Sequence, residues 1–228
     1  MPARVHIVDD DPSFRTAVER RLKQAGYQVA TYSSGQQLLE RLPDNDDPGC
    51  ILLDVRIPGL SGPELQSRLS KLGSILPVVF LTAYPDTGAT VRVIKAGAED
   101  FLIKPVKPEQ LLEAVARAID RHAATQDKQR QKQEAGALVA TLTPREREVF
   151  ELVVLGKMHK QIAIALGMAE RTVKAHRHKV MEKTKAQSLP ELVLIAERLG
   201  LLGPEGRPRD KEQAGSIPDA PGDNIKDP

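Results

Sequence analysis

The first half of the chain alternates short apolar runs with segments whose apolar residues recur at helical spacing. The runs are rich in Val, Ile and Leu and alternate little with polar residues, which is typical of strands buried on both faces of a parallel sheet. Residues 1–123 are therefore predicted to form an α/β domain with a five-stranded, doubly wound parallel sheet. The predicted strands are residues 5–8, 29–32, 51–55, 78–82 and 100–104.

Each predicted strand is followed by a segment with a helical pattern. Apolar residues three or four positions apart lie on one face of a helix, and such a face packs against a sheet. The fourth of these patterns is weaker than the others. The five sets are Val18, Leu22 and Ala25; Leu38, Leu39 and Leu42; Leu65, Leu69 and Leu72; Val91, Ile94 and Lys95; and Leu111, Leu112, Val115 and Ile119.

The pattern becomes entirely helical over residues 142–203. Thr143 and Glu146 form a capping box with Pro144 at the first helical position, and residues 188–191 form a second capping box. Gly167 separates two helical patterns by a short turn. Two helices joined in this way are typical of a helix-turn-helix, so we predict a small all-α helix-turn-helix domain.

Two further segments lack an apolar stripe. Residues 125–134 contain helix-forming residues, and we predict that residues 124–141 form a helical linker, with coil as the alternative. Residues 204–228 hold Gly, Pro and charges with few apolar residues, so we predict a disordered tail.

Composition narrows the class of protein. No run approaches 18 apolar residues and no apolar stretch of a signal peptide opens the chain, so we expect a cytoplasmic protein. The single Cys50, within an apolar run, is expected to be a buried small hydrophobe. The net charge of +2 is uneven, because residues 142–203 hold 11 basic and 7 acidic residues. That local excess is a weak indication of nucleic-acid binding.

Polar residues stand at the ends of four predicted strands. Asp9 and Asp10 follow the first strand, Asp54 lies in the third, Thr82 closes the fourth and Lys104 closes the fifth. Ligands of such sheets bind beyond the carboxyl ends of the strands, so these groups are expected to meet in one crevice. The neighbouring Asp11 precedes Pro12 and is expected to cap a helix instead.

The expected crevice has a specific chemistry. Three carboxylates do not all stay ionised unless a cation compensates them, and Mg²⁺ prefers oxygen ligands. A carboxylate can act as a nucleophile and form an aspartyl phosphate, while a hydroxyl and an ammonium group can bind the phosphoryl oxygens. Each feature has a plain structural interpretation when taken alone, as a turn, a cap or a strand end. The ordered set predicts a phosphoryl-acceptor site.

The stretches VDDDPSF, LLDVRIPGLSGPEL, VVFLTA and KAGAEDFLIKP resemble the CheY-like receiver domain of response regulators, over about residues 3–122. The resemblance implies that Asp54 is phosphorylated. It implies a Mg²⁺ site, in which Mn²⁺ can substitute, made by Asp9 through water, Asp10, Asp54 and the backbone carbonyl of Arg56. Thr82 and Lys104 would sense the phosphoryl group, and Phe101 would be an aromatic switch, although plain core packing is its alternative. In the family, the peptide bond between Lys104 and Pro105 is cis, and this sequence permits that isomer.

The second predicted helix of the helix-turn-helix has two distinct faces. At 100° per residue, Val173, His176 and Val180 face one way, which we take as the core side. The other face carries Lys, Arg and a small Ala and is suited to a DNA major groove, although a merely solvated surface helix has the same composition. The outward residues are Arg171, Lys174, Ala175, His178 and Glu182.

LTPREREV, residues 156–163 and ERTVKAHR resemble the LuxR-type helix-turn-helix, the output domain of FixJ- and NarL-type response regulators. The resemblance covers about residues 142–202 and implies base contacts from Lys174, Ala175 and His178. His159 and Ala169 depart from the family, whose capping positions commonly hold Asn, Ser or Thr, and weaker helix caps are expected there. The implied phosphate contacts are Lys160, Thr172, Arg177 and Lys179.

We therefore expect a two-component transcription regulator rather than an enzyme. A sensor histidine kinase would phosphorylate Asp54, and the phosphorylated chain would dimerise on promoter DNA and activate transcription with RNA polymerase. A phosphohydrolase is disfavoured because Arg56 stands where such enzymes carry a second Asp. A ligand-sensing LuxR-type regulator would need an aromatic pocket, and aromatics are scarce. A receiver that works without phosphate usually lacks one of the acids or the Lys, and none is missing here.

Overall fold

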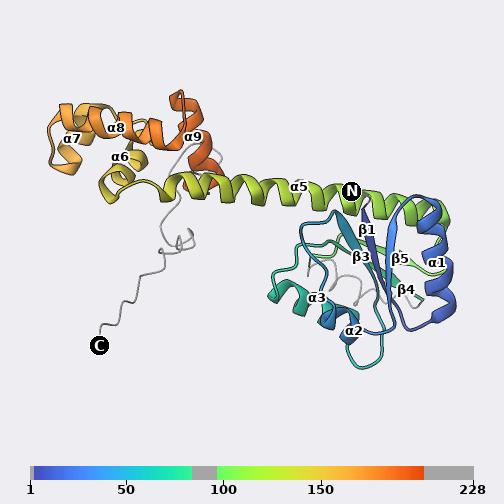
Figure 1. The fold of residues 1–228 in the computed structure, drawn as a ribbon. Helices are drawn as coiled ribbons and strands as arrows, with labels where there is room; N and C mark the ends of the chain where they lie inside the picture. Colours follow the sequence, from blue (N-terminus) through green and yellow to red (C-terminus); the bar gives the residue numbers. More distant parts are fainter. Residues whose placement is uncertain (1–2, 84–96, 203–228) are drawn as a thin grey trace, which may run out of the picture. The chain divides into compact units, whose positions relative to one another are not determined.

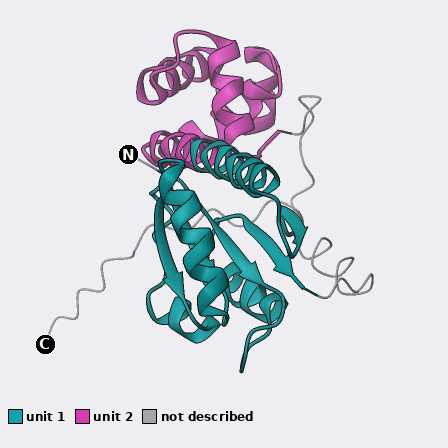
Figure 2. Cartoon of the chain, turned by 90° about the vertical axis from the view of Figure 1, so that its right-hand side faces the viewer, with its two compact units in different colours: residues 1–127 teal, residues 128–228 magenta. Residues whose placement is uncertain are grey.

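The computed structural model describes residues 3–83 and 97–202. It divides the chain into two compact units, Met1–Asp127 and Lys128–Pro228 (Figure 2). The fourth helical pattern and the predicted tail, residues 204–228, lie outside the described residues. Among the described helices, none is both long enough and apolar enough to cross a membrane.

Unit 1 is built on a parallel sheet with the strand order β2-β1-β3-β4-β5. This confirms the predicted doubly wound fold, and each strand lies within two residues of its predicted bounds. The chain runs from β1 to β2 on one side of β1 and then continues with β3 on the other side. This change of direction creates the crevice between β1 and β3 that such folds use for ligands. The strands are β1 (Arg4–Val8), β2 (Gln28–Tyr32), β3 (Gly49–Asp54), β4 (Val78–Thr82) and β5 (Asp100–Ile103).

Helices cover both faces of this sheet (Figure 1). On one face, α1 (Pro12–Gln24) and α5 (Pro108–Ala140) pack their apolar side chains on alternate residues of β1, β3 and β4. On the other face, α2 (Gly35–Glu40) and α3 (Gly62–Lys71) enclose a second cluster that includes Phe80. The strands β1, β3 and β4 are therefore buried from both sides, whereas the edge strands β2 and β5 are only partly buried.

Helix α1 begins where the sequence predicts. Asp11 is its N-cap, and its Oδ1 accepts hydrogen bonds from the backbone amides of Ser13 at 2.8 Å and Phe14 at 3.2 Å. The capping role expected for Asp11 is confirmed. The carboxylate of Asp11 is therefore engaged at the helix, directly after the two acids that follow β1.

Helix α5 extends beyond unit 1. Its residues 128–134 are exposed, in agreement with their polar composition. Ala135 and Val139 are each 2% exposed and belong to the hydrophobic core of unit 2. These two residues lie in the stretch that we predicted as linker, and the packed unit begins upstream of the domain start predicted at residue 142. Residues 135–140 are short apolar residues that directly follow the polar residues 125–134, and this brief run was included in the predicted linker.

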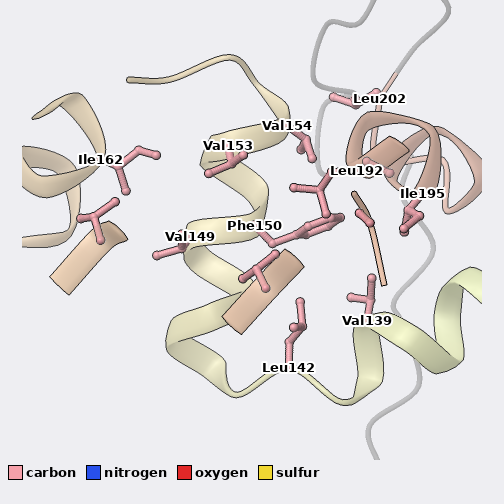
Figure 3. Packing of buried hydrophobic residues seen from close by; sticks show 14 of the residues in the cluster. Val139, Leu142, Val149, Phe150, Val153, Val154, Ile162, Leu192, Ile195 and Leu202 are labelled. Atoms are coloured by element: carbon pink, nitrogen blue, oxygen red, sulfur yellow. The ribbon is translucent and has the colours of Figure 1, made fainter. Parts of the chain in front are cut away.

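The described part of unit 2, residues 128–202, contains the end of α5 and four further helices, as expected for an all-α domain. Phe150 is fully buried, and Figure 3 shows side chains from α5, α6 and α9 around it. Gly167 ends α7 in the left-handed conformation with φ of 64°, which a residue without Cβ adopts at low cost. The helices are α6 (Pro144–Val154), α7 (His159–Leu166), α8 (Glu170–Thr184) and α9 (Leu189–Arg198).

The helix caps of unit 2 agree with the sequence in most places. Thr143 and Glu146 form the predicted capping box, and Ser188 caps α9. Ala169 is the N-cap of α8 and makes no side-chain hydrogen bond, because its methyl group has no polar atom. The expectation for His159 needs correction, because Met158 occupies the N-cap of α7 and His159 is the first helical residue. A one-residue shift of this kind cannot be read from helical periodicity.

Candidate functional site

Three carboxylates meet at the carboxyl ends of β1 and β3. Ligand oxygens of Asp9, Asp10 and Asp54 all lie within 4.8 Å of one another. Asp9 is fully buried and Asp54 is 8% exposed, whereas Asp10 is exposed to solvent. The sheet brings these residues together because β1 and β3 are adjacent parallel strands that end at the same edge. The cluster has the oxygen donors that a hard divalent cation such as Mg²⁺ prefers, so these residues fit that ion.

The ammonium group of Lys104 lies against two of these carboxylates. Its Nζ donates to Asp9 Oδ2 at 2.5 Å and also to Asp54 Oδ2. The backbone places it there, since Lys104 follows β5 and its amide donates to the Thr82 carbonyl at 2.7 Å. The Lys104–Pro105 peptide bond is cis, which is the isomer that the family resemblance permits. One cation thus compensates part of the negative charge in the crevice.

Burial and charge oppose each other in this site. Burial raises the pKa of Asp9, and the hydrogen bond from Lys104 lowers it only in part. Burial lowers the pKa of Lys104, but hydrogen bonds from its ammonium group to Asp54 and Asp9 outweigh burial and leave the pKa above its usual value. Lys104 is therefore charged at neutral pH. The carboxylates still exceed the local cations, which is the condition under which a divalent cation is attracted.

The remaining predicted residues of unit 1 lie around Asp54. The Asp54 Oδ1 atom accepts a hydrogen bond from the backbone amide of Arg56 at 2.8 Å, and the side chain of Arg56 is exposed. Thr82 is 2% exposed at the end of β4, beside β3. Phe101 is partly buried on β5 and packs against the core on the α2 and α3 side. The crevice therefore contains a potential nucleophile and an ammonium group, and Thr82 ends the strand next to the one that carries Asp54.

Two residues of α1 contribute to the site without having been predicted. Lys104 Nζ lies 4.1 Å from the centroid of the Phe14 ring, which is a cation–π contact. Arg15 Nη1 donates to the backbone carbonyl of Asp9 at 2.5 Å. Both residues lie in the first turns of α1, and the short connection after β1 brings them close. That short connection is the one signal in the sequence, and no motif specified their contacts.

The residues predicted to contact DNA lie on α7 and α8. Val173 and Val180 are buried, as the predicted inward face requires, and His176 is partly buried. The opposite face of α8 is open to solvent. Lys160, Lys174, Ala175, His178 and Lys179 are exposed, whereas Thr172 and Arg177 are partly buried. Helix α8 thus presents a basic outer surface next to the helix-turn-helix turn at Gly167.

Two families match the chain. Residues 5–116 match the response regulator receiver domain, which covers the crevice and most of unit 1. Residues 140–196 match the bacterial regulatory proteins of the luxR family, which covers α6 to α8 and most of α9. Each match falls on the part of the chain whose geometry suggested it.

Relatives with the same arrangement match most of the chain. Nodulation protein W of Bradyrhizobium diazoefficiens is 40% identical over 200 residues, which cover 87% of each protein. The transcriptional regulatory protein FixJ of Azorhizobium caulinodans is 38% identical over 198 residues, 86% of this chain and 93% of its own. Among solved structures, the response regulator StyR is similar with a TM-score of 0.74 and 39% identity, over 87% of this chain and 100% of that one.

Full-length FixJ from B. japonicum is a second similar structure, with a TM-score of 0.53 and 36% identity over 88% of this chain and 98% of that chain. Sequence motifs, fold and relatives thus agree over both units. The family consists of transcription regulators that bind DNA and are not enzymes. The chain belongs to the two-component response regulators of the FixJ type, with a receiver domain followed by a LuxR-type DNA-binding domain.

Proposed function

We propose that this response regulator is switched by phosphorylation of Asp54. The observation that carries the proposal is the approach of three carboxylates to within 4.8 Å, with the Lys104 ammonium group bonded to two of them. In the reaction, a carboxylate oxygen of Asp54 forms a bond to phosphorus while the bond from phosphorus to the donor breaks. A sensor histidine kinase is the natural donor for a receiver domain.

Mg²⁺, or Mn²⁺ in its place, would be held by Asp9, Asp10, Asp54 and the backbone carbonyl of Arg56. When bound, the ion neutralises the charge on the phosphoryl oxygens. Asp9 is buried beneath the site and acts through water or through its charge. Lys104 exchanges its contact with the Asp54 carboxylate for a phosphoryl oxygen, which keeps the ammonium group paired.

Thr82 and Phe101 would report the phosphorylated state. The Thr82 hydroxyl donates a hydrogen bond to a phosphoryl oxygen, and the movement of Thr82 opens space into which the Phe101 ring turns. The partial burial of Phe101 fits a ring with two available positions. The altered surface then favours a homodimer, in which two helix-turn-helix domains reach two DNA half-sites.

DNA binding by the phosphorylated protein would depend on α8. Lys174, Ala175 and His178 would read base edges in the major groove, and their exposure supports that role. The bound dimer would recruit RNA polymerase and activate transcription at a promoter. Four residues would hold phosphates, namely Lys160, Thr172, Arg177 and Lys179.

The test is mass spectrometry of the native chain and of Asp54→Ala after incubation with acetyl phosphate and Mg²⁺. We expect the native chain to gain one phosphoryl group and to shift to a dimer in gel filtration, with both changes lost in Asp54→Ala. EDTA should abolish the modification. A native chain that remains unmodified with acetyl phosphate and with a phosphorylated kinase would contradict the proposal.

A further inference from the structure

His159 and Arg177 form a direct contact between α7 and α8. Arg177 Nη1 and His159 Nε2 lie 3.0 Å apart, and both side chains are partly buried. An arginine side chain keeps its proton at all ordinary pH values and can only donate. His159 Nε2 must therefore be the acceptor, which requires a neutral ring that carries its proton on Nδ1. The contact therefore specifies which ring nitrogen of His159 accepts the hydrogen bond.

The guanidinium group of Arg177 carries a full positive charge at all ordinary pH values. Among the described residues, 3–83 and 97–202, no carboxylate forms an ion pair with Arg177. It lies instead beside the first residue of α7, whose N-cap Met158 makes no side-chain capping hydrogen bond. The start of a helix carries partial positive charge, and the neighbouring Lys160 adds a full charge. The arrangement leaves Arg177 with its charge uncompensated at a place suited to an anion.

We propose that His159 is a positioning residue for DNA binding. Its neutral ring holds the Arg177 guanidinium group at the start of α7, where the guanidinium group pairs with a phosphate of the DNA backbone. The inference rests on the proposed DNA contacts of α7 and α8 and adds a residue that none of those contacts includes. Without the ring, the long Arg177 side chain samples several rotamers, and its ordering has to occur during binding.

The role of His159 follows from what its ring can do. Positioning needs an acceptor at the reach of Nε2, and glutamine offers a carbonyl oxygen at similar reach, whereas leucine offers none. His159→Gln should therefore keep Arg177 in place and His159→Leu should release it. A ring that merely filled space would show the opposite order, because leucine packs better than glutamine among apolar neighbours.

The experiment measures binding of the full chain to a fluorescent 30-base-pair duplex of arbitrary sequence, by anisotropy over a range of salt concentrations. We expect Arg177→Met to weaken binding by about 5- to 10-fold and to reduce the salt slope by about 1. His159→Leu should also weaken binding, and the logarithm of its fold-change should be at least half of that for Arg177→Met. The double variant should be no weaker than Arg177→Met alone, and His159→Gln should bind like the native chain.

Lys179→Met is the matched control, because Lys179 is an exposed cation on the same helix without a contact to His159. Its loss should add to that of His159→Leu. Additive losses for His159→Leu and Arg177→Met, or native binding by His159→Leu, would overturn the role of His159. A native chain that fails to bind the duplex at low salt, both before and after treatment with acetyl phosphate and Mg²⁺, would instead contradict the proposed DNA contacts themselves.

A second measurement needs no DNA and is independent of the folding of any variant. Long-range proton–nitrogen NMR of the native chain distinguishes the two nitrogens of each histidine ring. We expect His159 to carry its proton on Nδ1 at neutral pH, with Nε2 as the acceptor. A proton on Nε2 would exclude the contact with Arg177 and overturn the proposal.

Discussion

Lys183 Nζ lies 2.6 Å from Glu146 Oε2 and ties α8 to the beginning of α6. The same Glu146 oxygen accepts a hydrogen bond from the backbone amide of Thr143 at 2.8 Å. Lys183 also donates a hydrogen bond to the Thr141 carbonyl at 3.2 Å. Glu146 is 3% exposed, so its charge is buried and multiply bonded. The contact lies in unit 2 and holds the proposed recognition helix against the segment that follows α5.

We expect Glu146→Gln to lower the free energy of unfolding of unit 2 by about 2 kcal/mol, because two charge-assisted hydrogen bonds are lost. Hydrogen exchange of α6 and α8 peptides in the full chain measures the effect. Glu148→Gln is the matched control, since Glu148 pairs with the exposed Arg145 and such pairs contribute little. Equal exchange rates in both variants would contradict the prediction.

The same contact predicts a dependence on acid. Hydrogen bonds from Lys183 and from the Thr143 amide lower the pKa of Glu146 to about 2, below its usual value of 4.5. The stabilisation is therefore fully present above about pH 4.5 and is lost as the pH falls towards 2. The difference between the native chain and Glu146→Gln should disappear over that range. A difference that stays constant down to pH 2 would argue against the assignment.

His6 should make the stability of unit 1 sensitive to mild acid. Burial and the charge of Arg4 lower the pKa of His6 from 6.5 to about 4, and its Nδ1 lies 3.1 Å from the Tyr32 hydroxyl. The unfolded chain takes up this proton below pH 6.5 and the folded chain does not, so stability is lost as the pH falls from 6.5 towards 4. The loss is up to about 3 kcal/mol.

Urea unfolding at several pH values measures this loss. His6→Gln keeps a hydrogen-bonding partner for Tyr32 and should flatten the dependence on pH between 6.5 and 4. His178→Gln removes an exposed histidine of unit 2 and should leave the stability of unit 1 unchanged. An unaltered slope in His6→Gln would show that other groups cause the dependence.

Gly62 packs against Asp54 at the end of β3, and a larger residue at this position would displace that strand end. A Cβ atom at this position would lie 2.5 Å from the Asp54 carbonyl oxygen and 2.9 Å from Phe80 Cε1. We expect Gly62→Ala to destabilise unit 1 by about 2 to 3 kcal/mol and to slow labelling by acetyl phosphate. Gly136→Ala is the control with the opposite sign, because its nearest atom is 3.8 Å away. It should stabilise α5 by about 0.5 to 1 kcal/mol, and thermal unfolding measures both.

The end of α5 should be required for the stability of unit 2. Ala135 and Val139 are buried in its core, so a fragment of residues 142–202 should be less stable than one of residues 128–202 by about 2 to 4 kcal/mol. Val139→Ala in the longer fragment should give an intermediate loss. Thermal unfolding followed by circular dichroism compares the three. Equal midpoints for both fragments would show that α5 contributes nothing.

Much of the fold is encoded in local patterns. Buried parallel strands need long apolar runs such as residues 78–82, and helices need a stripe that faces the sheet, so both kinds of element are visible along the chain. The Asp11 and Thr143 caps follow from short-range chemistry for the same reason. The positions of Asp9, Asp54 and Lys104 were predictable because residues at the ends of parallel strands gather at one edge.

Other features depend on contacts between residues far apart in the sequence. No local pattern indicates that Phe14 lies under Lys104, and the short apolar run at residues 135–140 does not show which unit it packs against. The contact of His159 with Arg177 is of the same kind, since the sequence showed only an unusual residue near a helix start. The sequence by itself determined the elements, their order and the acidic crevice, because periodicity and strand-end chemistry are local. The tertiary structure alone decided which side chains support those groups, because packing brings together residues whose spacing along the chain carries no signal.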